Sequence, residues 1–117
     1  MGKGTNSEET IAAISTPLGE GGIGIVRISG PASYAVLLKA FRPLSKTSRL
    51  ESHRLYLGII SHPNGGKAID QALAAFMKAP RSYTGEDVVE LSCHGGVAVL
   101  KKVLEAALAS GASRCPP

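Results

Sequence analysis

The segment from Ala79 to Gly96, APRSYTGEDVVELSCHGG, places a charged residue inside a run that otherwise favours a buried strand. Side chains alternate between the two faces of a strand, and one face of the predicted strand 87–92 is mostly apolar. Glu90 lies on the other face, between Val88 and Ser92. An unpaired carboxylate in such a position costs several kcal/mol. We therefore expect Glu90 to have a cationic partner or a ligand.

A second charged residue lies in another apolar strand. Residues 23–29, IGIVRIS, are rich in β-branched side chains and predict a strand in which Arg27 shares a face with Ile25. A guanidinium keeps its charge and therefore needs a partner. The residues alone leave two interpretations open. Either Arg27 forms a structural ion pair with Glu90 in the core, or both side chains face a ligand.

The remaining pattern predicts one α+β domain with a mixed or mostly antiparallel sheet and two packed helices. Residues 68–78 are ambiguous, because their alanines favour a helix whereas the turn at Asn64-Gly65 just before them favours a strand. We predict a strand there. The expected order is β-β-α-β-β-β-α, with strands at 11–15, 23–29, 54–60, 68–78 and 87–92 and helices at 31–41 and 96–110.

The two helices differ in how clearly the sequence defines them. Pro31 suits the first position of the first helix, whose expected apolar face includes Leu38 and Phe41. In the second helix, apolar residues from Val97 to Leu108 recur at helical spacing. Gly111 then suits a C-terminal cap.

The formal net charge of +4 raises the question of nucleic-acid binding. The basic residues are mostly scattered, apart from a concentration between Arg42 and Arg54 that contains no aromatic residue. We interpret that segment as a solvated linker, and contact with nucleic acid is the weaker alternative.

Composition also bears on cellular location. No apolar run approaches the ~20 residues that a membrane-spanning helix needs. Residues 1–10 are polar and predict a flexible leader rather than a signal peptide. Two cysteines do not make a disulfide framework, so we expect a cytoplasmic protein without membrane attachment.

Two glycine patterns resemble nucleotide-binding motifs without their context. Gly19, Gly21 and Gly24 match G-x-G-x-x-G, but a strand follows them where a dinucleotide site requires a helix. A tight turn explains them better. The phosphate-binding motif G-x-x-x-x-G-K-[ST] is absent from the sequence, since Ala68 follows Gly66-Lys67. We therefore expect no GTP binding by this chain.

Cys93 and His94 are adjacent but point to opposite faces of an extended strand, so they do not form a thiolate pair. We expect Cys93 to be a core residue. His94 is expected to shape the turn into the second helix, with a ligand role as the alternative. The backbone of Gly95-Gly96 can receive an anion at that helix start. The cysteines and histidines show no metal-ligand spacing.

Two separated motifs, TIAAISTPLGEGGIGIVRISGP at 10–31 and SYTGEDVVELSCHGG at 82–96, resemble the N-terminal domain of the MnmE (TrmE) family of tRNA-modification GTPases. The resemblance extends from about Thr10 to about Ser113. It implies a homodimerising domain that binds 5-formyl-tetrahydrofolate or a related reduced folate. By this resemblance the family's folate-binding arginine and glutamate fall on Arg27 and Glu90. Gly21, Gly22, Tyr83, His94, Gly95 and Gly96 are expected to surround this pair, behind the two residues that contact the ligand.

The resemblance also implies what the rest of such a protein does. A GTPase domain would follow and would bind GTP, potassium and magnesium. The complete protein would act with an FAD-dependent MnmG-type partner on the wobble uridine of tRNA. Residues 11–117 end before a folate-contacting lysine of the family, and Val97 replaces a usual proline. We expect this chain alone to be catalytically inactive.

Two alternatives from other classes remain. The chain could be a dimerisation scaffold in which Arg27 and Glu90 form only a structural pair. It could also be a small folate-dependent one-carbon transferase similar to aminomethyltransferases. The transferase would need a catalytic acid or base, for which only Glu86, Asp87 and His94 are candidates, without evident pairing.

Overall fold

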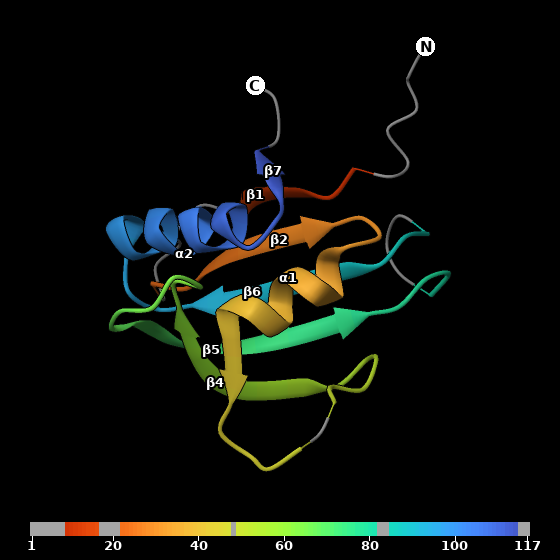
Figure 1. The fold of residues 1–117 in the computed structure, drawn as a ribbon, viewed down its shortest axis with the longest axis horizontal. Coiled ribbons are helices and arrows are strands. Elements are labelled where there is room, and N and C mark those ends of the chain that lie inside the picture. The colour runs from red at the N-terminus through yellow and green to blue at the C-terminus, as the bar shows by residue number, and fades with distance from the viewer. Residues whose placement is uncertain (1–8, 17–21, 48, 82–84, 115–117) are drawn as a thin grey trace.

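The computed structural model describes residues 9–16, 22–47, 49–81 and 85–114. Within these residues the strands form one seven-stranded sheet in the order β3-β4-β5-β6-β2-β1-β7 (Figure 1). The elements in chain order are β1 (Ile11–Thr16), β2 (Gly24–Ser29), α1 (Ser33–Ala40), β3 (Phe41–Pro43), β4 (Leu55–Ser61), β5 (Ala68–Met77), β6 (Val88–Cys93), α2 (Val97–Ala109) and β7 (Ser113–Arg114).

The sheet is mixed, as the sequence predicted. Neighbouring strands run antiparallel, except that β1 and β7 are parallel. The ambiguous segment 68–78 is a strand, β5, which confirms that prediction. The short edge strands β3 and β7 were not predicted. They contain three and two residues, too few to show an alternation of apolar and polar side chains.

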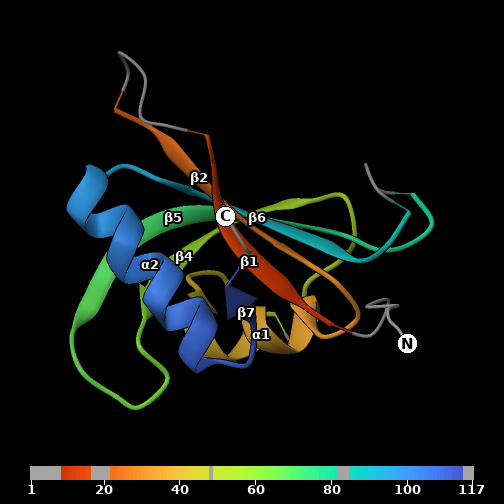
Figure 2. The ribbon, with the colours of Figure 1, turned by 90° about the horizontal axis from the view of Figure 1, so that it is seen from above.

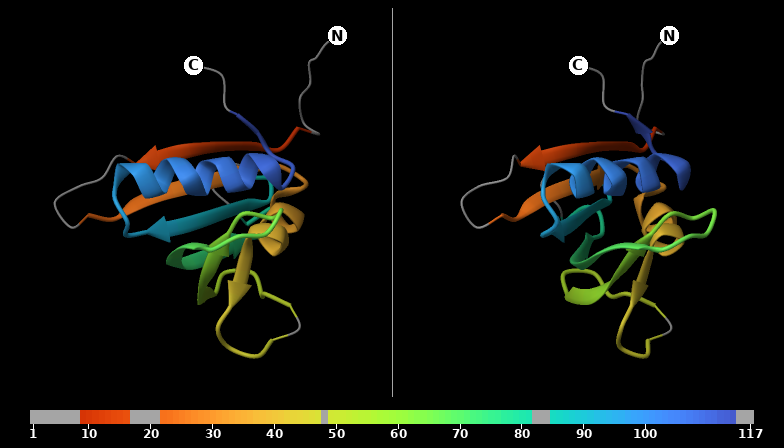
Figure 3. Two further views of the ribbon diagram at one scale, coloured as in Figure 1. Left: turned by 60° about the vertical axis from the view of Figure 1, so that its left-hand side comes forward. Right: turned by 90° about the vertical axis from the view of Figure 1, so that its left-hand side faces the viewer.

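Both helices pack on one face of the sheet (Figures 2 and 3). α2 lies against β1 and β2, and α1 lies against β6. The core between the layers contains the fully buried side chains of Val26, Ile28 and Leu91, which α2 covers with Leu100 and Val103. In the part of the chain that the structure describes, no element covers the opposite face. We call this side of the sheet the open face.

The first helix differs from the prediction in its start and in its buried face. It begins at Ser33, after a turn in which the backbone N–H of Ala32 donates to the Thr10 hydroxyl at 2.8 Å, so Pro31 is not its first residue. Its buried positions begin with Ser33, whereas Leu38 is 51% exposed. The other buried positions, Val36, Leu37 and Ala40, are apolar, so the position of the helix on the sheet rotates the buried face away from Leu38 and toward Ser33. Phe41 is buried from β3.

The second helix follows the prediction except at its first residue. Its core positions include Leu100, Val103 and Leu104, but Val97 is 57% exposed. The helix ends with Ser110 as its C-cap, and Gly111 follows with φ +125°. This backbone conformation favours glycine, which confirms Gly111 as the predicted terminator.

Candidate ligand-binding site

Arg27 and Glu90 lie directly opposite each other on the neighbouring strands β2 and β6. The Arg27 Nε and Nη2 atoms both donate to Glu90 Oε2, at 3.0 and 2.6 Å. The side chains are 39% and 17% exposed. The ion pair weighed as one interpretation is therefore present. It lies on the open face of the sheet, however, and not in the core.

The pair belongs to a row of side chains that crosses five strands. Leu55 on β4 is opposite Ala75 on β5, Ala75 is opposite Glu90, and Arg27 is opposite Ala13 on β1. The charged pair thus has small or apolar neighbours on both sides. A cavity of about 240 Å³ adjoins it over β1 and β2, lined by Ile11, Ala13, Ser15, Arg27 and Ser29.

This geometry suits recognition of a polar ligand. A ligand that offers donors to Glu90 and an acceptor to Arg27 can replace the contact without leaving either charge unpaired. In the contacts between the two side chains, Glu90 uses only Oε2. A carboxylate accepts adjacent N–H groups in bidentate fashion, and a guanidinium donates to carboxylate or carbonyl oxygens. The pair can therefore hold both kinds of group on one molecule.

The predicted glycine and histidine contacts lie at one end of the same strand pair. Gly24, the first residue of β2, is opposite Cys93, the last residue of β6. Gly22, just before β2, and His94, just after β6, therefore lie at the same end of the strand pair. The backbone N–H of His94 donates to Asp70 Oδ2 at 2.9 Å, and its side chain is exposed. Arg27 lies three positions inside β2, about 10 Å from that end at ~3.3 Å per residue. The structure therefore places these residues at the end of the strand pair, about 10 Å from Arg27, and not around the charged pair.

The helix start at this end requires its glycines. Gly96 has φ +92° and is the N-cap of α2, and a side chain on Gly95 would collide with Val99. Gly22 has φ +73°. Gly21 and Tyr83, which were also expected near the ligand site, lie outside the described residues, as do most of the expected leader 1–10 and Cys115.

Cys93 is a core residue, as predicted, with no exposed surface. Burial, and then the charge of Asp70, raises the pKa of its thiol from 9.0 to about 12. The thiol donates weakly to the Leu91 carbonyl at 3.6 Å. Among the described residues, no group of three or more His, Cys, Asp or Glu is placed to hold a metal ion. In the same part of the chain, no helix is long and apolar enough to span a membrane.

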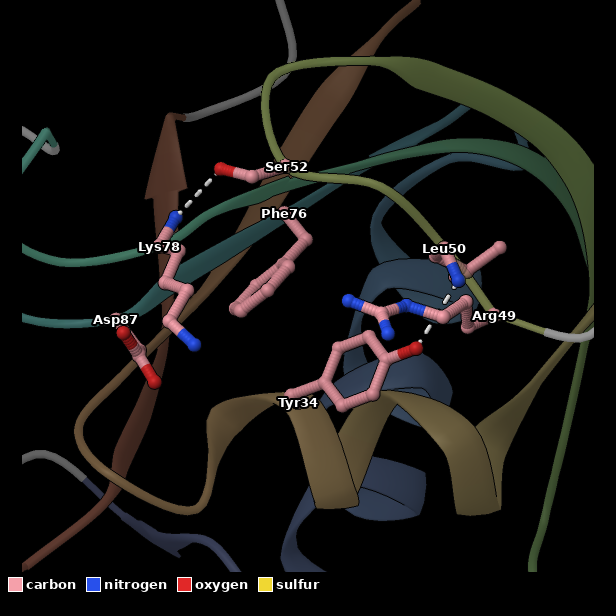
Figure 4. A pocket seen from close by; sticks show the side chains of 7 residues that line it. All are labelled: Tyr34, Arg49, Leu50, Ser52, Phe76, Lys78 and Asp87. Atoms are coloured by element: carbon pink, nitrogen blue, oxygen red, sulfur yellow. Dashed lines mark hydrogen bonds between the residues drawn. The ribbon is translucent and has the colours of Figure 1, made fainter.

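The interpretation of residues 42–54 as a solvated linker is only partly right. Leu50 is buried, and its backbone N–H donates to the Tyr34 hydroxyl at 3.0 Å. Arg49 and Ser52 line a cavity of about 380 Å³ beside α1 (Figure 4). Sequence reasoning missed this cavity because Tyr34 and Phe76, which also line it, come from distant parts of the chain.

The structure is thus an α+β domain that carries a cross-strand ion pair on the open face of its sheet. Residues 10–117 match the family described as "GTP-binding protein TrmE N-terminus", and the chain belongs to this family. Relatives named "tRNA modification GTPase MnmE" include those of Carboxydothermus hydrogenoformans, 51% identical over 94% of this chain, and Chloroflexus aurantiacus, 53% identical over 93%. That of Syntrophobacter fumaroxidans is 50% identical over 98% of this chain.

The match covers only part of these relatives. In each of the three, the aligned region is 24% of the relative's length. The chain therefore spans about a quarter of the proteins it resembles, and the resemblance concerns their N-terminal domain.

Proposed function

We propose that this chain is the folate-binding and homodimerising domain of a tRNA-modification GTPase of the MnmE type. The observation that carries the proposal is the Arg27–Glu90 pair on the open sheet face. These two residues are the ones that the family resemblance assigns to folate binding. The proposed ligand is 5-formyl-tetrahydrofolate or a related reduced folate.

The two side chains have complementary roles in this proposal. The Glu90 carboxylate accepts the adjacent N–H and amino groups of the pterin ring. The Arg27 guanidinium donates to a carbonyl or carboxylate oxygen of the same ligand. The adjoining cavity over β1 and β2 offers an apolar wall for the rest of the molecule. Titration of the 117-residue chain with 5-formyl-tetrahydrofolate by calorimetry tests the proposal, and absence of saturable binding counts against it.

The open face also supports the homodimer. Leu55 is 69% exposed, Leu57 42% and Leu73 36%. Leu57 and Leu73 are opposite each other on β4 and β5, in the row next to the charged pair. A contiguous exposed apolar surface marks an interaction site, and two-fold symmetric pairing is the commonest form of protein assembly. We propose a second copy of the chain as the occupant.

The wider activity is proposed from the names of the relatives and the family resemblance. The complete protein would modify the wobble uridine of tRNA in the cytoplasm together with an MnmG-type FAD protein. GTP, potassium and magnesium would bind in a separate GTPase domain. This chain would supply the folate site.

The transferase alternative has weaker support in the geometry. Asp87 Oδ1 accepts from the Ala79 backbone at 2.8 Å, and Glu86 Oε2 accepts from the Ser29 hydroxyl at 3.3 Å. His94 lies at the other end of β6, on the order of 20 Å from Asp87 at ~3.3 Å per residue. These candidates do not converge on one reacting atom, as general acid–base catalysis requires. The scaffold alternative differs from our proposal only in lacking the ligand.

A further inference from the structure

We propose that the groove between residues 49–54 and the end of β5 binds the phosphate backbone of RNA, with Arg49 and Lys78 contacting the phosphates. This groove lies apart from Arg27 and Glu90. The inference rests on the proposed function, because the relatives are named as tRNA-modification enzymes.

The deeper part of the groove is the cavity of about 380 Å³ beside α1. The rings of Tyr34 and Phe76 line it, with centroids 4.7 Å apart. Phe76 is 8% exposed and belongs to the core, so the half-buried Tyr34 ring supplies most of the aromatic surface that a ligand can reach. The Arg49 guanidinium and the Lys78 amino group point into it from opposite sides (Figure 4). Aromatic surface between two cations fits a nucleotide unit, which joins a phosphate to a ribose and a base, better than it fits a bare anion.

A second cavity of about 440 Å³ shares Ser52 and Lys78 with the first and extends the groove to His53 and Arg81. Arg49, Lys78 and Arg81 therefore lie along one groove. Within the described ranges, none of these three cations forms an ion pair with a carboxylate. Asp87 is the carboxylate in the lining, and its Oδ1 accepts a backbone N–H. Successive cations with few neighbouring acids suit a chain of phosphates.

The two walls of the groove are joined by hydrogen bonds that leave the charged ends of Arg49 and Lys78 unused. The backbone N–H of Lys78 donates to the Ser52 hydroxyl at 2.9 Å, and that of His53 donates to the Phe76 carbonyl at 2.7 Å. The His53 ring is hydrogen-bonded to the Arg81 carbonyl at 2.6 Å. The backbone of both walls is held in place by these bonds, so binding of a ligand does not have to order it.

Binding of an unmodified tRNA transcript to the 117-residue chain, measured by fluorescence anisotropy at several salt concentrations, tests the groove. The variant Arg49→Gln/Lys78→Gln should weaken binding on the order of tenfold. It should also reduce the slope of log K against log salt by about 1.4–1.8, which is about 0.7–0.9 for each charge removed. The matched control is Lys101→Gln/Lys102→Gln on the exposed face of α2, which also removes two positive charges. Its tRNA affinity should stay within about twofold of wild type.

A charge-preserving variant and a folate titration complete the test. Arg49→Lys/Lys78→Arg keeps both charges and should bind tRNA like wild type, which attributes the loss in the Gln variant to the missing charges. The proposal is overturned by absence of tRNA binding, by equal losses in the groove and α2 variants, or by displacement of tRNA with micromolar uridine monophosphate. Titration of Arg49→Gln/Lys78→Gln with folate separates the two proposals. If this variant binds folate like wild type, the loss of tRNA binding comes from the groove. If the wild-type chain binds no folate, the proposed folate site is wrong but the tRNA measurement still tests the groove.

Discussion

Arg27 and Glu90 form a directly opposed cross-strand ion pair, with Nη2 and Oε2 2.6 Å apart, on the face of the sheet that neither helix covers. A structural role and a ligand role make different demands on such a pair. A pair that only supports the fold need not be exposed. A pair that binds a ligand has to be reachable. Arg27 is 39% exposed, so the pair can be reached from solvent, as a ligand role requires.

The substitution Glu90→Gln should weaken 5-formyl-tetrahydrofolate binding with little effect on stability. It keeps the shape of the side chain but replaces one acceptor oxygen with a donor that faces the donors of the pterin. The expected loss is about 1.5–3 kcal/mol of binding free energy, the scale of a hydrogen bond to a charged group. Calorimetric titration measures the affinity, and thermal unfolding of the same samples measures stability.

Two companion variants make that result interpretable. Glu105→Gln makes the same chemical change on the exposed side of α2 and should leave affinity unchanged. Arg27→Ala should weaken binding by an amount similar to Glu90→Gln. If both site variants instead lower the melting temperature and keep folate affinity within twofold, the pair is structural and the scaffold alternative is correct.

The 117-residue chain should not bind GTP. Binding would need a loop whose backbone N–H groups surround the phosphates, followed by a lysine and a hydroxyl that holds magnesium. In this sequence Gly66-Lys67 is followed by Ala68, which has no hydroxyl. Calorimetry with GTP and magnesium should show no saturable heat, and micromolar affinity would contradict the prediction.

The predictable part of the fold was the part whose periodicity spans several residues. Strand β2 and helix α2 each have apolar residues at a regular spacing that one pattern can explain. The buried face of α1 was predicted only in part, because contact with the sheet buries Leu37 but selects Ser33 over the more apolar Leu38. Strand β3 follows α1 without an intervening loop, and its pairing with β4 is a tertiary contact.

The same division applies to the sites. Arg27 and Glu90 were identifiable because each is a charge within an apolar strand, and a buried or half-buried charge requires a partner. Their position on the open face depends on which side of the sheet the helices cover. The alternation of side chains along each strand does not determine that side. The groove beside α1 brings Tyr34 close to Phe76 and Lys78, residues about forty positions away, without any local motif.

The chain should form a dimer through its open face, and Leu57→Ser/Leu73→Ser should weaken it. These side chains are half-exposed and mutually opposed, so their loss removes apolar area that would be buried between copies. Sedimentation equilibrium at tens of micromolar should show wild-type dimer and a shift of this variant toward monomer.

A matched control comes from the helices. Leu38→Ser/Val97→Ser removes two side chains that are 51% and 57% exposed outside the open face, and it should not change the association. A monomeric wild type would rule out this dimer for the 117-residue chain. Equal weakening by both variants would move the interface away from the open face.

Gly58→Ala should destabilise the domain, because β3 approaches β4 closely at this position. A methyl group on Gly58 would collide with the Phe41 ring and with the Arg42 carbonyl oxygen. Overpacking of this kind costs about 1–3 kcal/mol. An unstrained glycine-to-alanine change would instead stabilise by roughly 0.4–1 kcal/mol. The sign of the change in unfolding free energy, measured in urea, decides whether the β3–β4 contact is as tight as described.

Stability should fall in alkaline solution because of Cys93. Its pKa is about 12 in the folded chain and 9.0 ordinarily, so the folded state holds this proton more tightly than the unfolded state. The stabilisation is complete below pH 9 and is lost as the pH rises toward 12, at roughly 1.4 kcal/mol per pH unit. Cys93→Ala removes the group and leaves the other titrating residues in place. Urea unfolding between pH 8.5 and 10.5 should therefore show a steeper loss in wild type than in Cys93→Ala. Parallel losses in the two proteins would mean that the buried thiol ionises as easily in the folded chain as in the unfolded one.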